Sequence, residues 1–230
     1  MQSRDGRFME GFALGQWQAN CYILGDEERG TAVVVDPGQG GLEPVRERLD
    51  ARGVRCEAVL LTHGHLDHLW SAPEVAAAFD APVLLHVDDT WLYADPGAAF
   101  GQFPPGTLEA QFGLRWKPDP DALQTFTDRT TFSFAGYAIT ARHTPGHTPG
   151  SSVFLLDDPG LGDPLMLSGD LLFAGSVGRT DLVGGDGDTQ VASLRRVVIP
   201  LEDDTVVAPG HGERTTVGTE RSSNPHLRHL

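Results

Sequence analysis

The chain has 230 residues, of which 40% are hydrophobic and 21% are charged, a composition typical of a folded domain and not of a disordered segment. Its 17 Lys and Arg residues are outnumbered by 32 Asp and Glu residues, so the formal net charge is -15. This charge repels phosphate backbones and anionic membrane surfaces, and we expect neither nucleic acid nor membranes as partners.

The first half of the chain alternates short apolar runs with helical periodicity. Runs rich in Val and Leu predict buried strands at residues 32–35, 58–61 and 83–86. The spacing of apolar residues predicts helices at residues 42–51, 69–79 and 88–93. This order is the β-α-β-α-β alternation of an α/β domain.

The second half contains shorter strands with less helix between them. Apolar runs predict strands at residues 131–134, 137–142, 152–156, 165–167 and 206–207, and one helix is predicted at 189–198. Two halves of similar character indicate two packed sheets flanked by helices. We expect one domain over residues 1–230, because the tail at 218–230 is too short for another.

The segment at residues 95–120 interrupts this pattern with five prolines, four glycines and almost no regular periodicity. It carries the aromatic residues Phe100, Phe103, Phe112 and Trp116. Loops of this length inside a compact domain are usually functional or mobile. The segment is either a flap that covers a substrate or a decorated crossover between strands.

The densest chemical signal is the run Thr62-His63-Gly64-His65-Leu66-Asp67-His68, directly after a predicted strand. Three imidazoles and a carboxylate crowd into six residues, which favours a cation that accepts their lone pairs. In an extended turn the side chains of His63 and His65 face the same side. Gly64 between them relaxes the backbone, so that the chain can wrap around a point.

Three further donors follow other apolar strands, each among Gly or Pro: His147, Asp170 and His211. A lone histidine beside a strand is usually a surface or core residue, but nothing in folding requires this combination. The candidate metal ligands are His63, His65, Asp67, His68, His147, Asp170 and His211. Seven donors exceed the need of one ion and predict two divalent ions, with zinc favoured and iron or manganese as alternatives.

A natural division gives one ion His63, His65 and His147, and the other Asp67, His68 and His211. Asp170 then bridges both. Each ion keeps an open position for a shared hydroxide, the feature that separates catalytic from structural sites. Catalysis is therefore assigned to this hydroxide as nucleophile, held with the help of Asp67 and Asp170.

Three residues near these motifs are candidates for support behind the ligands. His143 precedes His147 by four residues and is either such a support or a strand-end histidine bonded to backbone. Arg179 and Asp181 lie just after Asp170, and we interpret them as an ion pair that fixes the loop, with substrate contact as the alternative. Nothing in the sequence identifies the residues that bind substrate.

These motifs resemble the metallo-β-lactamase-fold hydrolases over residues 20–224. The H-x-H-x-D-H run at 63–68, the turn histidine His147, Asp170 and His211 carry the resemblance. The runs at 168–173 and 176–182, and the ending at 209–225, are similar to compact single-domain members of the glyoxalase II branch, which lack the C-terminal helical domain of the larger enzymes.

The resemblance implies a four-layer αββα sandwich, an α/β fold with mixed sheets, whose metal site lies at one edge of the two sheets. It also implies hydrolysis of a small-molecule acyl thioester such as S-lactoyl-glutathione. Thiols have a pKa near 8.5, so a thiolate can depart without full protonation, whereas an amide nitrogen cannot. Antibiotic hydrolysis in this superfamily commonly draws on Lys or Asn near the metals, and here only Lys117, Asn20 and Asn224 exist.

Two other functions remain open. Persulfide dioxygenases of this superfamily hold one iron with two histidines and a carboxylate, here His63, His147 and Asp170. That group tends to have Cys where this chain has Ser151, which favours the hydrolase. A non-catalytic metal-binding protein on the same fold is the third interpretation.

The cysteine content and the apolar runs bear on the compartment. Cys21 and Cys56 are the only cysteines, and two lone thiols form neither a disulfide framework nor a C-x-x-C motif. No apolar run approaches the roughly 18 to 20 residues that cross a bilayer. We therefore expect a cytoplasmic protein.

Overall fold

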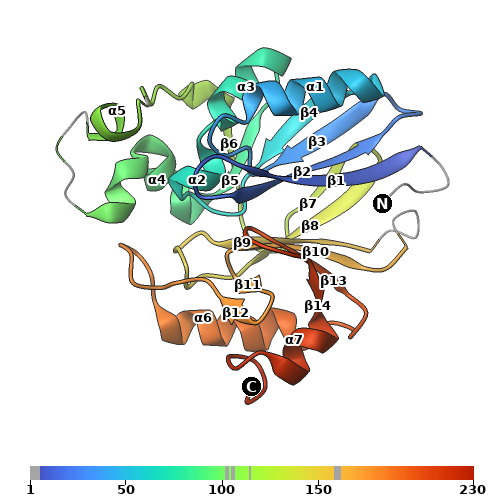
Figure 1. Cartoon of the computed structure of the whole chain (residues 1–230), viewed down its shortest axis with the longest axis vertical. Helices are drawn as coiled ribbons and strands as arrows, with labels where there is room; N and C mark the ends of the chain where they lie inside the picture. Colours follow the sequence, from blue (N-terminus) through green and yellow to red (C-terminus); the bar gives the residue numbers. More distant parts are fainter. Residues whose placement is uncertain (1–5, 102–103, 105–106, 114, 158–161) are drawn as a thin grey trace.

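The computed structural model describes residues 6–101, 104, 107–113, 115–157 and 162–230. Two six-stranded sheets pack face to face, and helices cover the outer face of each (Figure 1). Both sheets contain parallel and antiparallel pairs. The predicted αββα sandwich with mixed sheets is therefore confirmed.

The first sheet has the strand order β1-β2-β3-β4-β5-β6. Its strands are β1 (Arg7–Leu14), β2 (Ala19–Asp26), β3 (Thr31–Val35), β4 (Arg55–Leu60), β5 (Val83–His86) and β6 (Leu123–Phe126). The strands predicted at 32–35, 58–61 and 83–86 are confirmed as β3, β4 and β5. The hairpin of β1 and β2 is not predicted from the sequence.

The helices on this sheet are α1 (Leu42–Arg52), α2 (Leu66–Leu69), α3 (Ala72–Phe79) and α4 (Thr90–Ala94), the last preceded by a 3-10 helix at Val87–Asp89. The prediction of one continuous helix over residues 69–79 is wrong, because α2 ends at Leu69 and a new helix, α3, begins after Ser71. The Ser71 backbone N–H donates to Pro37 O (2.8 Å), and its hydroxyl accepts from Gly41 N (3.0 Å). These contacts to a distant loop satisfy polar groups that a continuous helix would use.

The second sheet has the strand order β14-β13-β10-β9-β8-β7. Its strands are β7 (Thr131–Phe134), β8 (Tyr137–His143), β9 (Ser152–Leu156), β10 (Leu165–Gly169), β13 (Val206–Pro209) and β14 (Thr215–Thr216). A small two-stranded sheet of β11 (Leu172–Phe173) and β12 (Ser176–Val177) follows β10. The predicted strands of this half are confirmed, with β14 added at the edge.

Helices α6 (Gly187–Ser193) and α7 (Val217–Ser223) cover the second sheet. The helix predicted at 189–198 is present as α6 and a π-helical turn at Leu194–Val198. Buried apolar residues of this turn, among them Leu194 and Val198, pack with Val153 and Val207 of the sheet. This apolar face holds the helix on the sheet.

The core between the sheets explains why the central strands are apolar on both faces. Val33 and Val35 of β3 point to the second sheet, whereas Val34 points to the helices. Strands buried on both faces read as continuous apolar runs. The side chain of Tyr137 is fully buried in this layer, and its hydroxyl contacts the carbonyl oxygens of Phe8 and Gly25.

The segment at 95–120 is a crossover, because it connects β5 to β6, which pair in parallel. Its described part contains a 3-10 helix at Pro96–Phe100 and the short helix α5 (Thr107–Phe112), and a further 3-10 helix at Pro120–Ala122 leads into β6. The Trp116 indole donates to Tyr93 O (2.8 Å) and ties the crossover to α4. Phe103 lies outside the described residues.

Candidate metal centre

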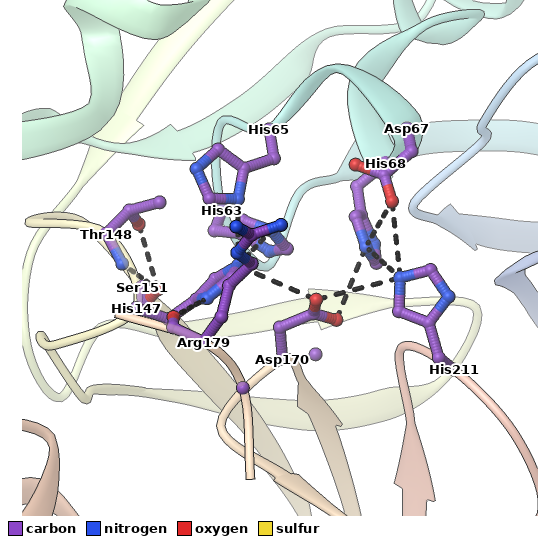
Figure 2. Close-up of polar contacts among 12 residues, drawn as sticks. His63, His65, Asp67, His68, His147, Thr148, Ser151, Asp170, Arg179 and His211 are labelled. Carbon is purple, nitrogen blue, oxygen red and sulfur yellow. Dashed lines mark hydrogen bonds and ion pairs between the residues drawn. The ribbon is translucent and has the colours of Figure 1, made fainter. Parts of the chain in front are cut away.

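The predicted donors converge at one edge of the two sheets (Figure 2). The run His63–His68 follows β4 of the first sheet and continues into α2, with His65 in extended conformation just before the helix. The second sheet supplies the other three donors from the ends of strands: His147 between β8 and β9, Asp170 after β10, and His211 after β13.

The first group consists of His63, His65 and His147, all buried. The distance from His65 Nδ1 to His147 Nε2 is 2.8 Å, and that from His147 Nε2 to His63 Nε2 is 3.2 Å. The three rings meet edge to face. Their nitrogens thus point at one spot.

The second group consists of Asp67, His68 and His211. His211 Nε2 lies 3.2 Å from Asp67 Oδ2 and 3.3 Å from His68 Nε2. Asp170 lies between the two groups: its carboxylate is 3.5 Å from His147 Nε2, 3.3 Å from His68 Nε2 and 3.6 Å from His211 Nε2. The structure therefore brings all seven predicted donors together, and a further cluster of His63, His68 and Asp170 connects the two groups.

Hydrogen bonds behind the rings fix which nitrogen carries the proton. The Thr62 hydroxyl donates to Asp36 Oδ2 (2.6 Å), so its oxygen is free to accept from His63 Nδ1 at 3.0 Å. His147 Nδ1 lies 2.6 Å from Arg179 O, and a carbonyl only accepts. The Nε2 atoms of His63 and His147 then carry lone pairs that face each other, which is favourable only with a cation between them.

Burial sets the protonation of the first group. Burial, together with the neighbouring His68 and His147, lowers the pKa of His63 well below its usual value. Burial and His147 lower the pKa of His65 to about 3. Burial alone would raise the pKa of Asp170, but His68 outweighs it and the net shift is downward. Neutral imidazoles in the first group are in the protonation state that a divalent metal requires. In the second group, against the effect of burial, Asp170 and Asp67 raise the pKa of His68 and His211, so a metal bound there would displace protons.

Two buried carboxylates that sequence reasoning missed hold the ligand loops. Asp36 accepts from Thr62 N (2.8 Å) and lies 3.1 Å from His68 Nδ1. Asp89 accepts from Gly64 N (2.8 Å), Gly150 N (2.6 Å) and the Thr148 hydroxyl (2.6 Å), and so links the His63 and His147 loops. Asp36 directly follows β3, the same strand-exit signal that identified Asp170, and could have been found in this way.

The three candidate supporting residues have different surroundings. His143 Nε2 lies 2.7 Å from Pro149 O, and its ring stacks on His86 at 3.9 Å, in a cluster with Asp88 apart from the seven donors. Arg179 and Asp181 form a two-point ion pair (2.6 and 2.7 Å) whose side chains are exposed. Arg179 contacts the metal ligands through its backbone carbonyl oxygen, which lies 2.6 Å from His147 Nδ1.

Acid is expected to destabilise the fold through His86. Burial and the neighbouring His143 lower the pKa of His86 from 6.5 to about 4. The unfolded chain then binds more protons between these values, so His86 contributes stability above pH 6.5 that is lost as the pH falls towards 4. Urea unfolding from pH 7 to pH 4.5 measures this loss. His86→Phe should lose less stability over this range than the wild type, and equal losses would contradict the assignment.

A pocket of about 380 Å³ opens over the donors. Besides donors of both groups it is lined by the side chains of Trp17, Leu66, Phe100, Phe173, Arg179 and Leu182. Trp17 belongs to the turn between β1 and β2. The same hairpin holds the His211 loop, because the Asn20 amide donates to Pro209 O and Gly212 O, both at 2.9 Å.

Replacing Gly210 is expected to disrupt the second group. A Cβ at this position would overlap Asp170 Oδ1 and lie 2.8 Å from His68 Cε1. Gly210→Ala should therefore weaken metal binding roughly tenfold or more, the usual effect of displacing ligands. Metal titration of the purified variant measures this. Gly187→Ala is the matched control, since its Cβ would meet only Thr180 Oγ1 at 3.4 Å. Equal affinities for both variants would contradict the geometry.

The fold and the donor set define a metal-binding αββα domain. The chain belongs to the metallo-beta-lactamase superfamily, whose family model matches residues 14–211, and it is a hydrolase of this superfamily. Within the described ranges, no helix has the length and apolar character needed to span a bilayer.

Two curated relatives align along nearly their whole length. The uncharacterized protein ML0493 of Mycobacterium leprae is 39% identical over 220 residues, which cover 96% of this chain and 98% of that protein. Hydroxyacylglutathione hydrolase GloC of Haemophilus influenzae is 32% identical over 212 residues, which cover 92% of this chain and 93% of GloC.

Two solved structures share the fold at similar identity. The B3 metallo-beta-lactamase BLEG-1 superposes with a TM-score of 0.80 at 33% identity, covering 96% of this chain and 99% of that one. TTHA1623, solved in a di-iron-bound form, superposes with a TM-score of 0.76 at 34% identity, covering 95% of this chain and 100% of that one.

Proposed function

We propose that this protein is a metal-dependent thioesterase of the hydroxyacylglutathione hydrolase type. The observation that carries the proposal is the pair of donor groups, both in contact with Asp170, on the floor of a pocket of about 380 Å³. The similarity to GloC along nearly the whole chain supports the same reaction class.

The proposed centre holds two divalent ions. His63, His65 and His147 would hold one, Asp67, His68 and His211 the other, and Asp170 would contact both. When bound, such ions lower the pKa of water and polarise a carbonyl group. Imidazole and carboxylate suit zinc, which we favour, as well as iron and manganese. The di-iron-bound form of TTHA1623 supports a two-metal centre and iron as an alternative.

The protein's own residues do the positioning. Asp36 and the Arg179 carbonyl fix the rings of His68 and His147 through their Nδ1 atoms. Leu66 and Phe173 wall the pocket beside the donors and give the substrate an apolar surface there. A thiol has a pKa near 8.5 and can leave as thiolate, so a thioester requires no dedicated acid from these walls.

The similarity to BLEG-1 raises lactam hydrolysis as a competing activity, and the side chains near the centre argue against it. The side-chain amide of Asn20 donates hydrogen bonds to the carbonyl oxygens of Pro209 and Gly212. The side-chain amide of Asn224 donates hydrogen bonds to Ser176 O and to the Glu220 carboxylate. Lys117 does not line the pocket within the described part of the chain. No Lys or Asn is thus directed at a lactam carboxylate.

The donor count argues against a single-iron dioxygenase. Such a site would use His63, His147 and Asp170 and leave four converging donors without a purpose. Ser151, at the position where that group tends to have Cys, is hydrogen-bonded to Thr148 (Oγ1 to Oγ, 2.8 Å). Serine in this place does not supply the thiol of that group.

The test is thiol release by purified protein reconstituted with zinc, iron or manganese. S-Lactoylglutathione and simple acyl thioesters should be hydrolysed, and chelator treatment should abolish the activity, with recovery on adding metal back. Metal analysis of the active form should give about two ions per chain. Oxygen uptake with glutathione persulfide, or hydrolysis of a β-lactam without thioester cleavage, would overturn the proposal.

A further inference from the structure

A second pocket of about 480 Å³ adjoins the one over the metal centre and shares Trp17 and Phe100 with it. We call this second pocket the aromatic extension; it is lined by Gln16, Trp17, Phe100, Gln111 and Phe112. The two pockets together have the size of a small-molecule site. A substrate cleaved at the metal centre therefore has room for one of its halves in the extension.

Two aromatic side chains of the lining, Trp17 and Phe112, pack on each other and on Trp70, which lies behind them. Trp17 contacts Phe112 at 5.3 Å and Trp70 at 5.9 Å between ring centroids, and Trp70 contacts Phe112 at 6.1 Å. The rings come from the β1–β2 turn, the end of α2 and α5. Two of these pairs are edge-to-face and the Trp17–Trp70 pair is tilted; such contacts hold the rings in place, so that Trp17 and Phe112 present ring surface to an apolar ligand.

The rim of the pocket is apolar and open to solvent. Among the described residues the exposed large hydrophobic side chains are Val87, Phe100 at 43% and Val183 at 47%. Of these, Phe100 lines both pockets. An exposed aromatic side chain at the junction of two pockets is available to contact a ligand.

Among the residues that the structure describes, none that lines the extension carries a charge. Its lining consists of two glutamines and three aromatic residues. In the pocket over the metal centre, Arg179 is the cation among the described lining residues, and its guanidinium is already paired with both oxygens of Asp181. In a protein of net charge -15, carboxylates on a ligand in the extension would be unpaired and repelled.

We propose that the aromatic extension binds the thiol half of the substrate, and that this half is uncharged and apolar, with an aromatic or similar group that packs on Trp17. The inference rests on the proposed thioesterase function. The acyl half then lies in the pocket over the metal centre, beside the donor residues. Thioesters of thiols that carry several charges, such as glutathione, are expected to be the poorer substrates of this protein.

The experiment compares thioacetates that share one acyl group. S-Benzyl thioacetate carries the uncharged aromatic thiol half, whereas the thioacetates of 3-mercaptopropanoate and glutathione carry charged ones. We expect kcat/KM of the metal-loaded protein to be at least about tenfold higher for the benzyl compound, the size of effect that apolar pocket contacts give.

Variants separate binding in the extension from intrinsic reactivity of the thioesters. Trp17→Ala should lower the ratio of kcat/KM for the benzyl compound to kcat/KM for the 3-mercaptopropanoate compound roughly tenfold. Gln111→Lys should raise kcat/KM for the anionic 3-mercaptopropanoate compound, and Gln111→Glu should lower it. Phe134→Ala is the control: this half-buried ring stacks on Phe132 in the second sheet, so its loss should not change the substrate ratio.

A binding measurement distinguishes failure of the aromatic-site proposal from failure of the thioesterase proposal. Calorimetry with the non-hydrolysable benzyl methyl sulfide should show binding to the wild type that Trp17→Ala loses. Hydrolysis with no preference for the benzyl compound, or a substrate ratio unchanged in Trp17→Ala, would overturn the inference and leave the thioesterase standing. Trp17-dependent binding of the sulfide without cleavage of any thioester would support the aromatic site and overturn the thioesterase.

Discussion

Asp170→Asn is expected to lower thioester hydrolysis by roughly 10³-fold, about 4 kcal/mol of transition-state stabilisation, and to reduce the bound metal. Asp170 is the carboxylate that contacts both donor groups, with His147 at 3.5 Å on one side and His211 at 3.6 Å on the other. The carboxylate is ionised at neutral pH because His68, against the effect of burial, lowers its pKa. The neutral amide keeps the shape and removes that charge.

The measurement is the hydrolysis rate together with metal stoichiometry on the same sample. Asp204→Asn is the matched control: its carboxylate is exposed in the loop before β13, so its rate and metal content should equal those of the wild type. If Asp170→Asn keeps two ions and an activity within tenfold of the wild type, the position of Asp170 between two ions is wrong.

Asp36→Asn is expected to weaken metal binding by roughly 10- to 100-fold, the effect typical of residues that orient a ligand. Asp36 Oδ2 accepts from the Thr62 hydroxyl and faces His68 Nδ1. An amide N–H at the position of Oδ2 would face the Thr62 hydroxyl hydrogen and the His68 Nδ1–H, which are hydrogen-bond donors themselves. The ring of His68 would then lose the hydrogen bond that orients it. The backbone of Asp36 has φ 51°, which Asn tolerates, so the substitution leaves the loop conformation intact.

Asp26→Asn separates this effect from a general loss of stability. Asp26 is also a buried carboxylate on the first sheet, where it accepts from the backbone of Glu28 and Arg29 far from the donors. Both variants should unfold at lower denaturant concentration, but only Asp36→Asn should lose metal affinity in titrations with zinc. Equal metal affinities in the two variants would show that Asp36 has no role in orienting His68.

The sequence identifies the donors because catalytic chemistry leaves unusual residue combinations at strand ends. His63 to His68, Asp170 and His211 stand out among Gly and Pro without any knowledge of packing. The helix start at Ser71 has a local signal that the prediction overlooks: Pro73 lies in the first turn of α3, and proline is disfavoured inside a helix that begins earlier. The contacts of Ser71 with Pro37 and Gly41, which are distant along the chain, stabilise this break.

The hairpin of β1 and β2 escapes sequence reading for another reason. In β1 only part of each face is buried, and Gly11 interrupts the alternation that marks a strand. This omission affects the description of the pocket over the donors, because Trp17 lines that pocket and Asn20, from the same hairpin, holds the His211 loop. Residues that line a pocket need no distinctive spacing, so they emerge only once the chain is folded.

The donors are divided between the two sheets: four follow β4 of the first sheet, and three follow β8, β10 and β13 of the second. A metal ion bound in this centre would cross-link the two sheets. Its binding free energy then becomes part of the free energy of unfolding. A cell that is short of metal would lose intact copies of this protein as well as activity, because the empty form unfolds more readily and is degraded.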